Sequence, residues 1–121
     1  MILVDTSVWV DHLRKGDPVL ADLLARRQAL GHPFVSGELA LGSLRQHNLI
    51  LHAIDRLPQA VAAGDREVRL LIDGAGLLGS GIGYVDAHLV AATRLTPGSL
   101  LWTRDKKLQT VTLRFGLAFV P

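Results

Sequence analysis

The chain begins with an apolar run, Met1 to Val4, that is followed at once by Asp5, Thr6 and Ser7. A short apolar run that ends at polar residues is typical of a strand buried on both faces of a parallel sheet. Sites in open parallel sheets form outside the carboxyl ends of the strands. We therefore predict that Asp5 lies at a functional edge of such a sheet.

The composition indicates one compact domain without covalent cross-links. The 121 residues are 49 % hydrophobic and 20 % charged, whereas a disordered chain contains much less apolar material, so we predict a single domain over residues 1–121. The absence of cysteine excludes disulfides, thiolate zinc sites and a cysteine nucleophile. No apolar run approaches the roughly 18 residues of a membrane span, and the start of the chain lacks a basic leader, so we expect a cytoplasmic protein with no membrane partner.

The first half of the chain alternates between helical and extended patterns. Residues 17–30 are predicted to form a helix that Asp17 caps. A very short strand over residues 34–36 is predicted to follow and to lead into a helix that carries Glu38.

The second half of the chain continues this alternation. It is predicted to begin with a helical stretch over residues 48–63 broken by Pro58, followed by a helix within residues 64–78 with Asp65 as its cap. A loop over residues 79–83 then leads to a helix over residues 84–95 with Asp86 in its first turn. The last predicted elements are an extended segment over residues 100–103, a helix after Asp105 and a closing strand over residues 117–120. Short strands that alternate with helices favour an α/β fold with a parallel sheet covered on both faces.

Four acidic residues occupy related places in this pattern. Asp5 and Asp105 follow predicted strands, and Glu38 and Asp86 begin helices that start at the same edge of the sheet, so we predict that the four converge. Taken singly, each also fits a structural role as a helix cap or as an acid near a helix start. Convergence favours a site, because carboxylates that share a pocket repel one another unless a cation compensates their charge.

The predicted cation is Mg²⁺ or Mn²⁺. The available ligands are all oxygen atoms, since the chain has no cysteine and its five histidines include no pair at helical i,i+4 spacing. Oxygen ligands suit these ions better than zinc. One or two such ions would activate a water molecule, hold a scissile phosphate and stabilise the leaving oxygen, so we expect phosphodiester chemistry.

Neighbouring polar side chains are predicted to support this site. The hydroxyl residues that flank the acids could orient the carboxylates, with turn capping as the alternative; they are Thr6, Ser7 and Thr103. Basic residues beside the last acid could bind the phosphate backbone, although such pairs are often ordinary solvated helix faces; they are Arg104, Lys106 and Lys107.

Four segments together resemble the acidic motifs of PIN-domain ribonucleases, in the VapC-like toxin branch of toxin–antitoxin pairs. They are MILVDTSVWVDHL at residues 1–13, PFVSGELALGSLR at residues 33–45, GYVDAHLVAA at residues 83–92 and LLWTRDKKL at residues 100–108. The resemblance spans nearly the whole chain in the family's order. It implies that the metal-binding acids are Asp5, Glu38, Asp86 and Asp105, with Thr103 as the hydroxyl residue of a T-x-D segment.

The same resemblance implies a three-layer α/β/α sandwich with a short, mostly parallel central sheet. It also implies RNA cleavage that depends on Mg²⁺ or Mn²⁺, frequent homodimers, and inhibition by a small VapB-like antitoxin whose tail enters the site. One departure concerns spacing, because only Ser36 and Gly37 separate the predicted second strand from Glu38, where relatives often have several residues.

Other features are assigned structural roles. The GSGIG segment at residues 79–83 is predicted to be a loop rather than a phosphate cradle, because a helix precedes it. Trp9 and Trp102 are expected in the core rather than on RNA bases. Residues 48–76 carry more apolar side chains than one small core absorbs, so part of this stretch is expected to face a dimer or antitoxin partner.

Two other functions stay open. A Mg²⁺-dependent phosphatase would use Asp5 as its nucleophile, but its motif needs a second aspartate where this chain has Ser7. A non-catalytic nucleic-acid or protein-binding α/β module would use its acids as helix caps. Carboxylates spread far apart in space would favour that module.

Overall fold

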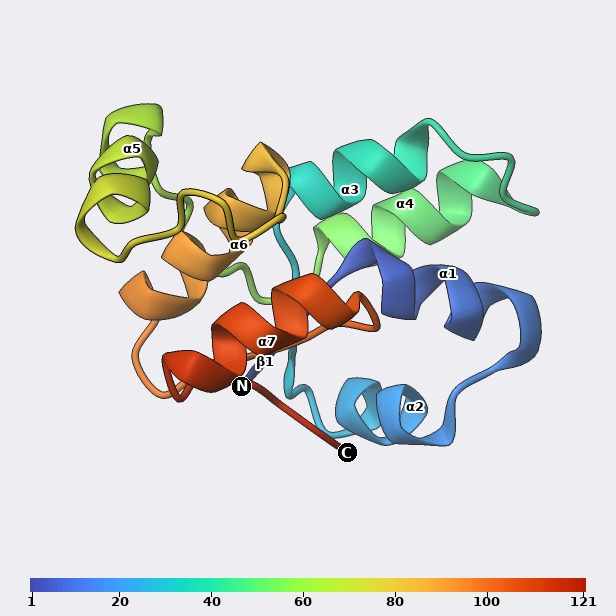
Figure 1. Ribbon diagram of the computed structural model, residues 1–121. Helices are drawn as coiled ribbons and strands as arrows, with labels where there is room; N and C mark the ends of the chain where they lie inside the picture. Colours follow the sequence, from blue (N-terminus) through green and yellow to red (C-terminus); the bar gives the residue numbers. More distant parts are fainter.

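The computed structural model describes residues 1–121 and has an α/β architecture (Figure 1). The strands are β1 (Ile2–Val4), β2 (Ala29–Leu30) and β3 (Leu100–Trp102), and they form one parallel sheet in the order β2-β1-β3. The helices are α1 (Thr6–Lys15), α2 (Pro18–Ala25), α3 (Pro33–Ala40), α4 (His47–Asp55), α5 (Asp65–Gly74), α6 (Tyr84–Leu95) and α7 (Lys106–Arg114). The predicted α/β sandwich around a short parallel sheet is confirmed.

β1 is the central strand and is buried on both faces. Its residue Ile2 pairs with Ala29 on one side and with Leu100 on the other. All of β1 is buried, which requires side chains from helices on both faces of the sheet. Figure 1 shows α7 crossing in front of β1, with α3 packed beside α4 and α5 beside α6. The N-terminal apolar run is therefore the interior strand that its composition predicts.

The prediction of a helix over residues 17–30 is wrong at its C-terminal end. α2 ends at Ala25, and Arg27 adopts a left-handed backbone conformation with a φ of 56°, which turns the chain away from the helix. Ala29 and Leu30 then extend beside β1 as β2, and both are buried.

The prediction of a strand over residues 34–36 is also wrong, because these residues lie in α3. The Nδ1 atom of His32 accepts a hydrogen bond of 3.0 Å from the backbone N–H of Phe34, and Pro33 occupies the first helical position. A side-chain cap and a proline at this position both favour the start of a helix. Since β2 ends before α3 begins, several residues separate the strand from Glu38, and the departure from the spacing of PIN relatives disappears.

The chain after α4 extends the sheet edge, whereas the prediction resumes the helical stretch after its break at Pro58 and continues it to residue 63. Gly31 and Gln59 form an isolated parallel bridge. The backbone N–H of Gly31 donates to the carbonyl of Pro58 at 2.8 Å, and Ala60 donates to the carbonyl of Gly31 at 2.9 Å. Proline disfavours a helix interior, so the break at Pro58 ends the helical stretch.

The C-terminal segment forms less strand than predicted over residues 117–120. Leu101 and Ala118 form an isolated parallel bridge, supported by a hydrogen bond of 2.9 Å from the N–H of Phe119 to the carbonyl of Leu101.

The prediction that Asp65 caps its helix is wrong, because Asp65 is the first residue of α5.

Several predictions are confirmed. α6 has the predicted bounds, and the segment 79–83 before it is irregular. Trp9 and Trp102 are 3 % and 2 % exposed, so both belong to the core. None of the helices combines the length and the apolar character that a membrane crossing needs.

Arg104 ties the end of β3 to the first two helices. Its Nε lies 2.8 Å from Oδ2 of Asp11, and its Nη2 lies 2.7 Å from Oδ2 of Asp17. The other oxygen of Asp17 accepts hydrogen bonds from the backbone of Val19 and Leu20 and so caps α2. The hydrogen bond from Leu20 is the main cause that holds the pKa of Asp17 below its usual value, and Arg104 adds to it.

Replacing Asp17 should separate the cap from the ion pair. Asp17→Ala removes both and should lower the free energy of unfolding by about 1–2 kcal/mol, whereas Asp17→Asn keeps a capping oxygen and should cost about half as much. Urea titrations at pH 7 measure both. The charge of Asp17 stabilises the fold above its ordinary pKa and is lost as the pH falls through the lowered native pKa, so the cost of Asp17→Asn should vanish in acid. Equal costs for the two variants at pH 7 would contradict the capping role.

Candidate active site

Asp5 follows β1 directly and is held by two hydroxyl groups. Its Oδ2 accepts hydrogen bonds of 2.7 Å from Ser7 and 2.8 Å from Thr103. Although Asp5 stands at the N-cap position of α1, its side chain makes no capping hydrogen bond. The carboxylate is 7 % exposed, and Oδ1 accepts no hydrogen bond from the protein. The helix-cap interpretation therefore does not apply to Asp5.

Thr103 connects Asp5 to the backbone of Asp105. Its Oγ1 donates to Asp5 and accepts a hydrogen bond of 3.0 Å from the N–H of Asp105. Ser7 adds a parallel link, because its Oγ accepts a hydrogen bond of 3.0 Å from the N–H of Arg104. The two hydroxyls thus join the carboxyl ends of β1 and β3.

Asp105 is the N-cap of α7. Its Oδ1 accepts a hydrogen bond of 3.0 Å from the N–H of Leu108, so the capping role is real for one oxygen. Oδ2 accepts no hydrogen bond from the protein. Lys106 and Lys107 follow in the first turn of α7, and neither makes an ion pair.

Glu38 lies in the second turn of α3 and accepts a hydrogen bond from a side chain of α1. Its Oε1 accepts a hydrogen bond of 2.6 Å from Oγ1 of Thr6, which is the first residue of α1. His32 caps α3, so Glu38 has no capping role there. The three hydroxyl residues predicted to orient carboxylates, Thr6, Ser7 and Thr103, all donate hydrogen bonds to them.

Asp86 lies in the first turn of α6, where its Oδ2 accepts a hydrogen bond of 3.2 Å from the N–H of Gly83. Burial raises the pKa of Asp86 above its usual value, and the negative charges of Asp5, Asp105 and Glu38 raise it further. Acids from three distant segments therefore lie near enough to Asp86 to affect its pKa. No three histidine or acidic side chains, however, are gathered closely enough to bind a metal ion as they stand.

No basic side chain forms an ion pair with any of these four acids. The ion pairs of the chain join Arg26 to Asp22 and Arg104 to both Asp11 and Asp17, and His88 is hydrogen-bonded to Asp65. The guanidinium of Arg104, predicted to bind phosphate, therefore already has two carboxylate partners. Each of the four acids also keeps one oxygen without a hydrogen-bond donor; these atoms are Asp5 Oδ1, Glu38 Oε2, Asp86 Oδ1 and Asp105 Oδ2.

Sequence reasoning missed a polar cluster on α5 and α6 next to Asp86. Oδ1 of Asp65 accepts hydrogen bonds of 2.8 Å from the hydroxyl of Tyr84 and 2.9 Å from Nε2 of His88. These two hydrogen bonds, with that of Tyr84 the larger cause, lower the pKa of Asp65 below its usual value. The i,i+4 spacing of Tyr84 and His88 on one helical face was the sequence signal for this cluster.

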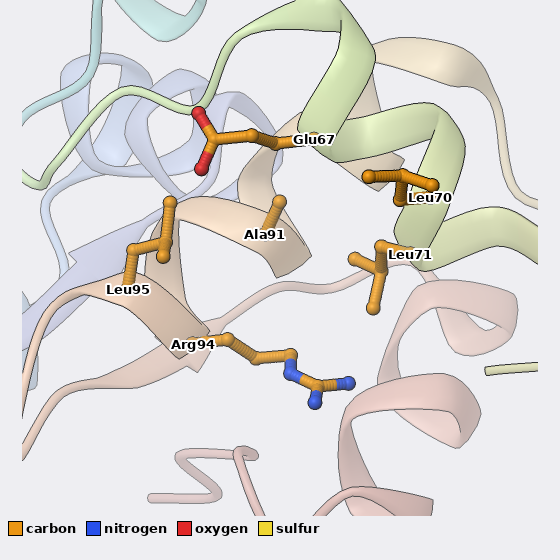
Figure 2. Close-up of a pocket in the computed structure, with 6 residues that line it drawn as sticks. All are labelled: Glu67, Leu70, Leu71, Ala91, Arg94 and Leu95. Carbon is orange, nitrogen blue, oxygen red and sulfur yellow. The ribbon is translucent and has the colours of Figure 1, made fainter. Parts of the chain in front are cut away.

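Two apolar hollows on the surface lie apart from the four acids. A groove of about 360 Å³ lies between α5 and α6. Figure 2 shows the residues that line it, Glu67, Leu70, Leu71, Ala91, Arg94 and Leu95. A smaller groove of about 220 Å³ lies between α1 and α4 and includes Trp9 and Ile50. Leu49 and Leu70 are each 63 % exposed, so residues 48–76 do present apolar surface, as predicted.

Comparison with known proteins finds relatives that match along the whole chain, although no family model matches it. Ribonuclease VapC32 of Mycobacterium tuberculosis, strain CDC 1551 / Oshkosh, is 44 % identical over 118 residues, which cover 98 % of this chain and 95 % of the relative. Ribonuclease VapC32 of strain ATCC 25618 / H37Rv gives the same identity and coverage. The match therefore includes all four acidic segments.

Removing the hydroxyl of Thr103 should destabilise the fold. Thr103→Val keeps the shape of the side chain but removes one of the two hydroxyl donors to the buried Asp5 and leaves the N–H of Asp105 without a partner, so the free energy of unfolding should fall by about 1–3 kcal/mol. Thr103→Ser keeps the oxygen and should cost less. Thr110→Val is the matched control, because Thr110 is exposed and donates only to a carbonyl of its own helix. Chemical denaturation that finds equal costs for Thr103→Val and Thr110→Val would contradict the role of Thr103.

Removing the charge of Asp86 should stabilise the protein in EDTA. Since its pKa is raised, Asp86 favours the fold below its ordinary pKa, and this contribution is lost as the pH rises through the raised pKa. Asp86→Asn should therefore raise Tm by about 1–3 °C at pH 7 and by less near pH 4, as thermal scans will measure. Asp22→Asn, which removes an exposed acid that is paired with Arg26, should give no gain. A lower Tm for Asp86→Asn at pH 7 would contradict the repulsion.

Proposed function

Because the chain belongs to the VapC family of PIN-domain ribonucleases, we propose that it is a toxin endoribonuclease whose four carboxylates bind Mg²⁺ or Mn²⁺ to hydrolyse RNA. The observation that carries the proposal is that Asp5, Glu38, Asp86 and Asp105 each keep one carboxylate oxygen without a hydrogen-bond donor, and the raised pKa of Asp86, caused by burial and by the other three carboxylates, supports it. None of these acids has a basic partner in the chain. Such a group of charges calls for a cation from outside the chain.

The donor set fits a hard divalent cation. Each of the four acids keeps one free oxygen atom, and magnesium and manganese prefer carboxylate oxygens and water. Side-chain rotations are needed to bring these oxygens into one coordination sphere, because the acids are not arranged for binding as they stand. We assign Asp5, Asp86 and Asp105 as ligands of one or two ions, and Glu38 as a further ligand or as the base that orients water.

Other residues of the candidate site orient the carboxylates or attract the RNA backbone. Ser7 and Thr103 occupy Oδ2 of Asp5 and so leave its Oδ1 available to a cation, while Thr6 orients Glu38. Lys106 and Lys107, at the positive N-terminal end of α7, attract the phosphate backbone. When bound, the cation supplies a water molecule of lowered pKa and stabilises charge on the scissile phosphate.

The alternative of a binding module that uses its acids as caps receives divided support. Asp86 and Asp105 each accept a hydrogen bond from backbone at a helix start, as that module requires. Asp5 and Glu38 accept hydrogen bonds only from hydroxyl groups, and neither caps a helix. Capping therefore does not account for the set as a whole, and we favour the nuclease.

Family membership also leads us to propose a small VapB-type antitoxin as the protein partner, and a homodimer as the assembly. The groove between α1 and α4 and the exposed side chains of Leu49 and Leu70 provide apolar surface for such contacts.

RNA cleavage assays test the nuclease directly. The protein should cut total RNA with Mn²⁺ or Mg²⁺, EDTA should abolish cleavage, and an excess of Mn²⁺ should restore it. Asp5→Asn should lower the rate by about 100-fold or more, because it removes a charged oxygen ligand. Asp22→Asn should cleave at the rate of the unmodified protein, since Asp22 lies on the exposed face of α2.

A binding readout accompanies the assay. Mn²⁺ should raise Tm of the unmodified protein and of Asp22→Asn, but not that of Asp5→Asn, because a ligand stabilises only the state that binds it. Undiminished cleavage in EDTA would overturn the metal mechanism. Equal cleavage by Asp5→Asn and Asp22→Asn would overturn the assignment of Asp5.

A further inference from the structure

Two aromatic rings stay exposed at the starts of the helices that carry Glu38 and Asp86. The chain has six aromatic residues, and the two tryptophans are buried. Phe34, in the first turn of α3, is 38 % exposed, and Tyr84, the first residue of α6, is 45 % exposed. A chain with so few aromatic side chains therefore places its two exposed rings at the starts of the helices that carry Glu38 and Asp86.

Both rings pack on one buried imidazole. The ring centroid of Phe34 lies 4.6 Å from that of His88, and the ring centroid of Tyr84 lies 4.8 Å from it. His88 is only 3 % exposed and is held by Asp65, which also binds the hydroxyl of Tyr84. Each ring therefore packs against His88 on one side and is partly exposed to solvent. Because the contact with His88 restricts its motion, the ring loses little conformational entropy when it binds a flat ligand.

The positions of the rings relate them to the acids. Phe34 and Glu38 are four residues apart on α3, so they share one face with their Cβ atoms about 5–6 Å apart. Tyr84 lies two residues before Asp86 and so on a different face of α6, where it packs on His88 as Phe34 does. Tyr84 therefore helps to hold the imidazole that supports Phe34. A nucleotide with its phosphate at the acids has the ring of Phe34 within reach of its base.

We propose that the ring of Phe34, supported by His88 and Tyr84, stacks on an unpaired base next to the scissile phosphate. This inference rests on the proposed nuclease function. Base pairing hides the faces of bases in a duplex, so only a single-stranded or looped base can stack on a protein ring. Such stacking tolerates any base, because every base has a π face, and contributes about 10-fold or more to affinity.

The test pairs ring removal with base removal. The substrate is a single-stranded oligoribonucleotide with a mapped cleavage site, compared with versions that are abasic at either nucleotide beside that site. For the unmodified protein, one abasic position should lower kcat/KM by about 10-fold. Phe34→Leu should lower kcat/KM on the intact RNA by a similar factor, and the abasic substitution should then cause no further loss.

Matched variants separate stacking from general damage. Phe115→Leu makes the same exchange at a ring that lies between Arg94 and Arg114, and it should keep the full abasic penalty. Tyr84→Leu should reduce that penalty, whereas Tyr84→Phe, which retains the ring and loses the hydrogen bond to Asp65, should keep it. Tm of every variant is measured alongside.

Two results would overturn the inference while leaving the nuclease intact. One is an abasic penalty of equal size in Phe34→Leu and in the unmodified protein, and the other is equal cleavage of the oligoribonucleotide and its duplex. If the protein does not cleave RNA at all, the nuclease proposal fails. Quenching of a 2-aminopurine oligoribonucleotide in EDTA then decides on stacking: quenching that Phe34→Leu abolishes supports it, and quenching that the variant leaves unchanged, or none, refutes it.

Discussion

The hydrogen bond from Thr103 to Asp5 holds together the edge of the sheet on which the candidate site depends. It is buried, 2.8 Å long, and joins residues that are 98 positions apart. β1 and β3 pair in parallel, so their carboxyl ends lie side by side, and Thr103 links the carboxylate after β1 to the backbone of Asp105. Because both strands are buried, this edge is rigid, which is the condition for a site whose groups must keep fixed positions.

The acids at this edge of the sheet have no basic side chain as a partner. Arg104 directly precedes Asp105 in the sequence, yet its guanidinium forms ion pairs with Asp11 and Asp17 instead. The carboxylates that raise the pKa of Asp86 therefore repel it without relief from a basic side chain. A purely structural role would be served better by paired charges, because Asp5 is buried and burying an unpaired charge is costly. Unrelieved repulsion of this kind is typical of sites that bind an external cation.

The elements that carry three of the four candidate acids could be predicted from the sequence, because Asp5, Asp86 and Asp105 each lie next to a local signal. The apolar run before Asp5, the helix with Asp86 in its first turn and the hydroxyl two residues before Asp105 are all visible in short windows. These signals locate the ends of elements, and the geometry of a parallel sheet brings those ends together.

The segment between α2 and α3 could not be predicted in the same way. Leu30 continues the apolar spacing of α2, and the left-handed conformation of Arg27, which ends that helix, is uncommon for a residue other than glycine. The cap of α3 is His32, which is outside the usual set of capping residues. The partners of Arg104 and His88 were also hidden, because they lie far away in the chain. Anomalous diffraction from a crystal soaked in Mn²⁺ tests the central claim most directly. The account predicts a manganese peak with an oxygen of both Asp5 and Asp86 within about 2.0–2.6 Å; a crystal with no peak there, or with manganese bound only elsewhere on the protein, would contradict it.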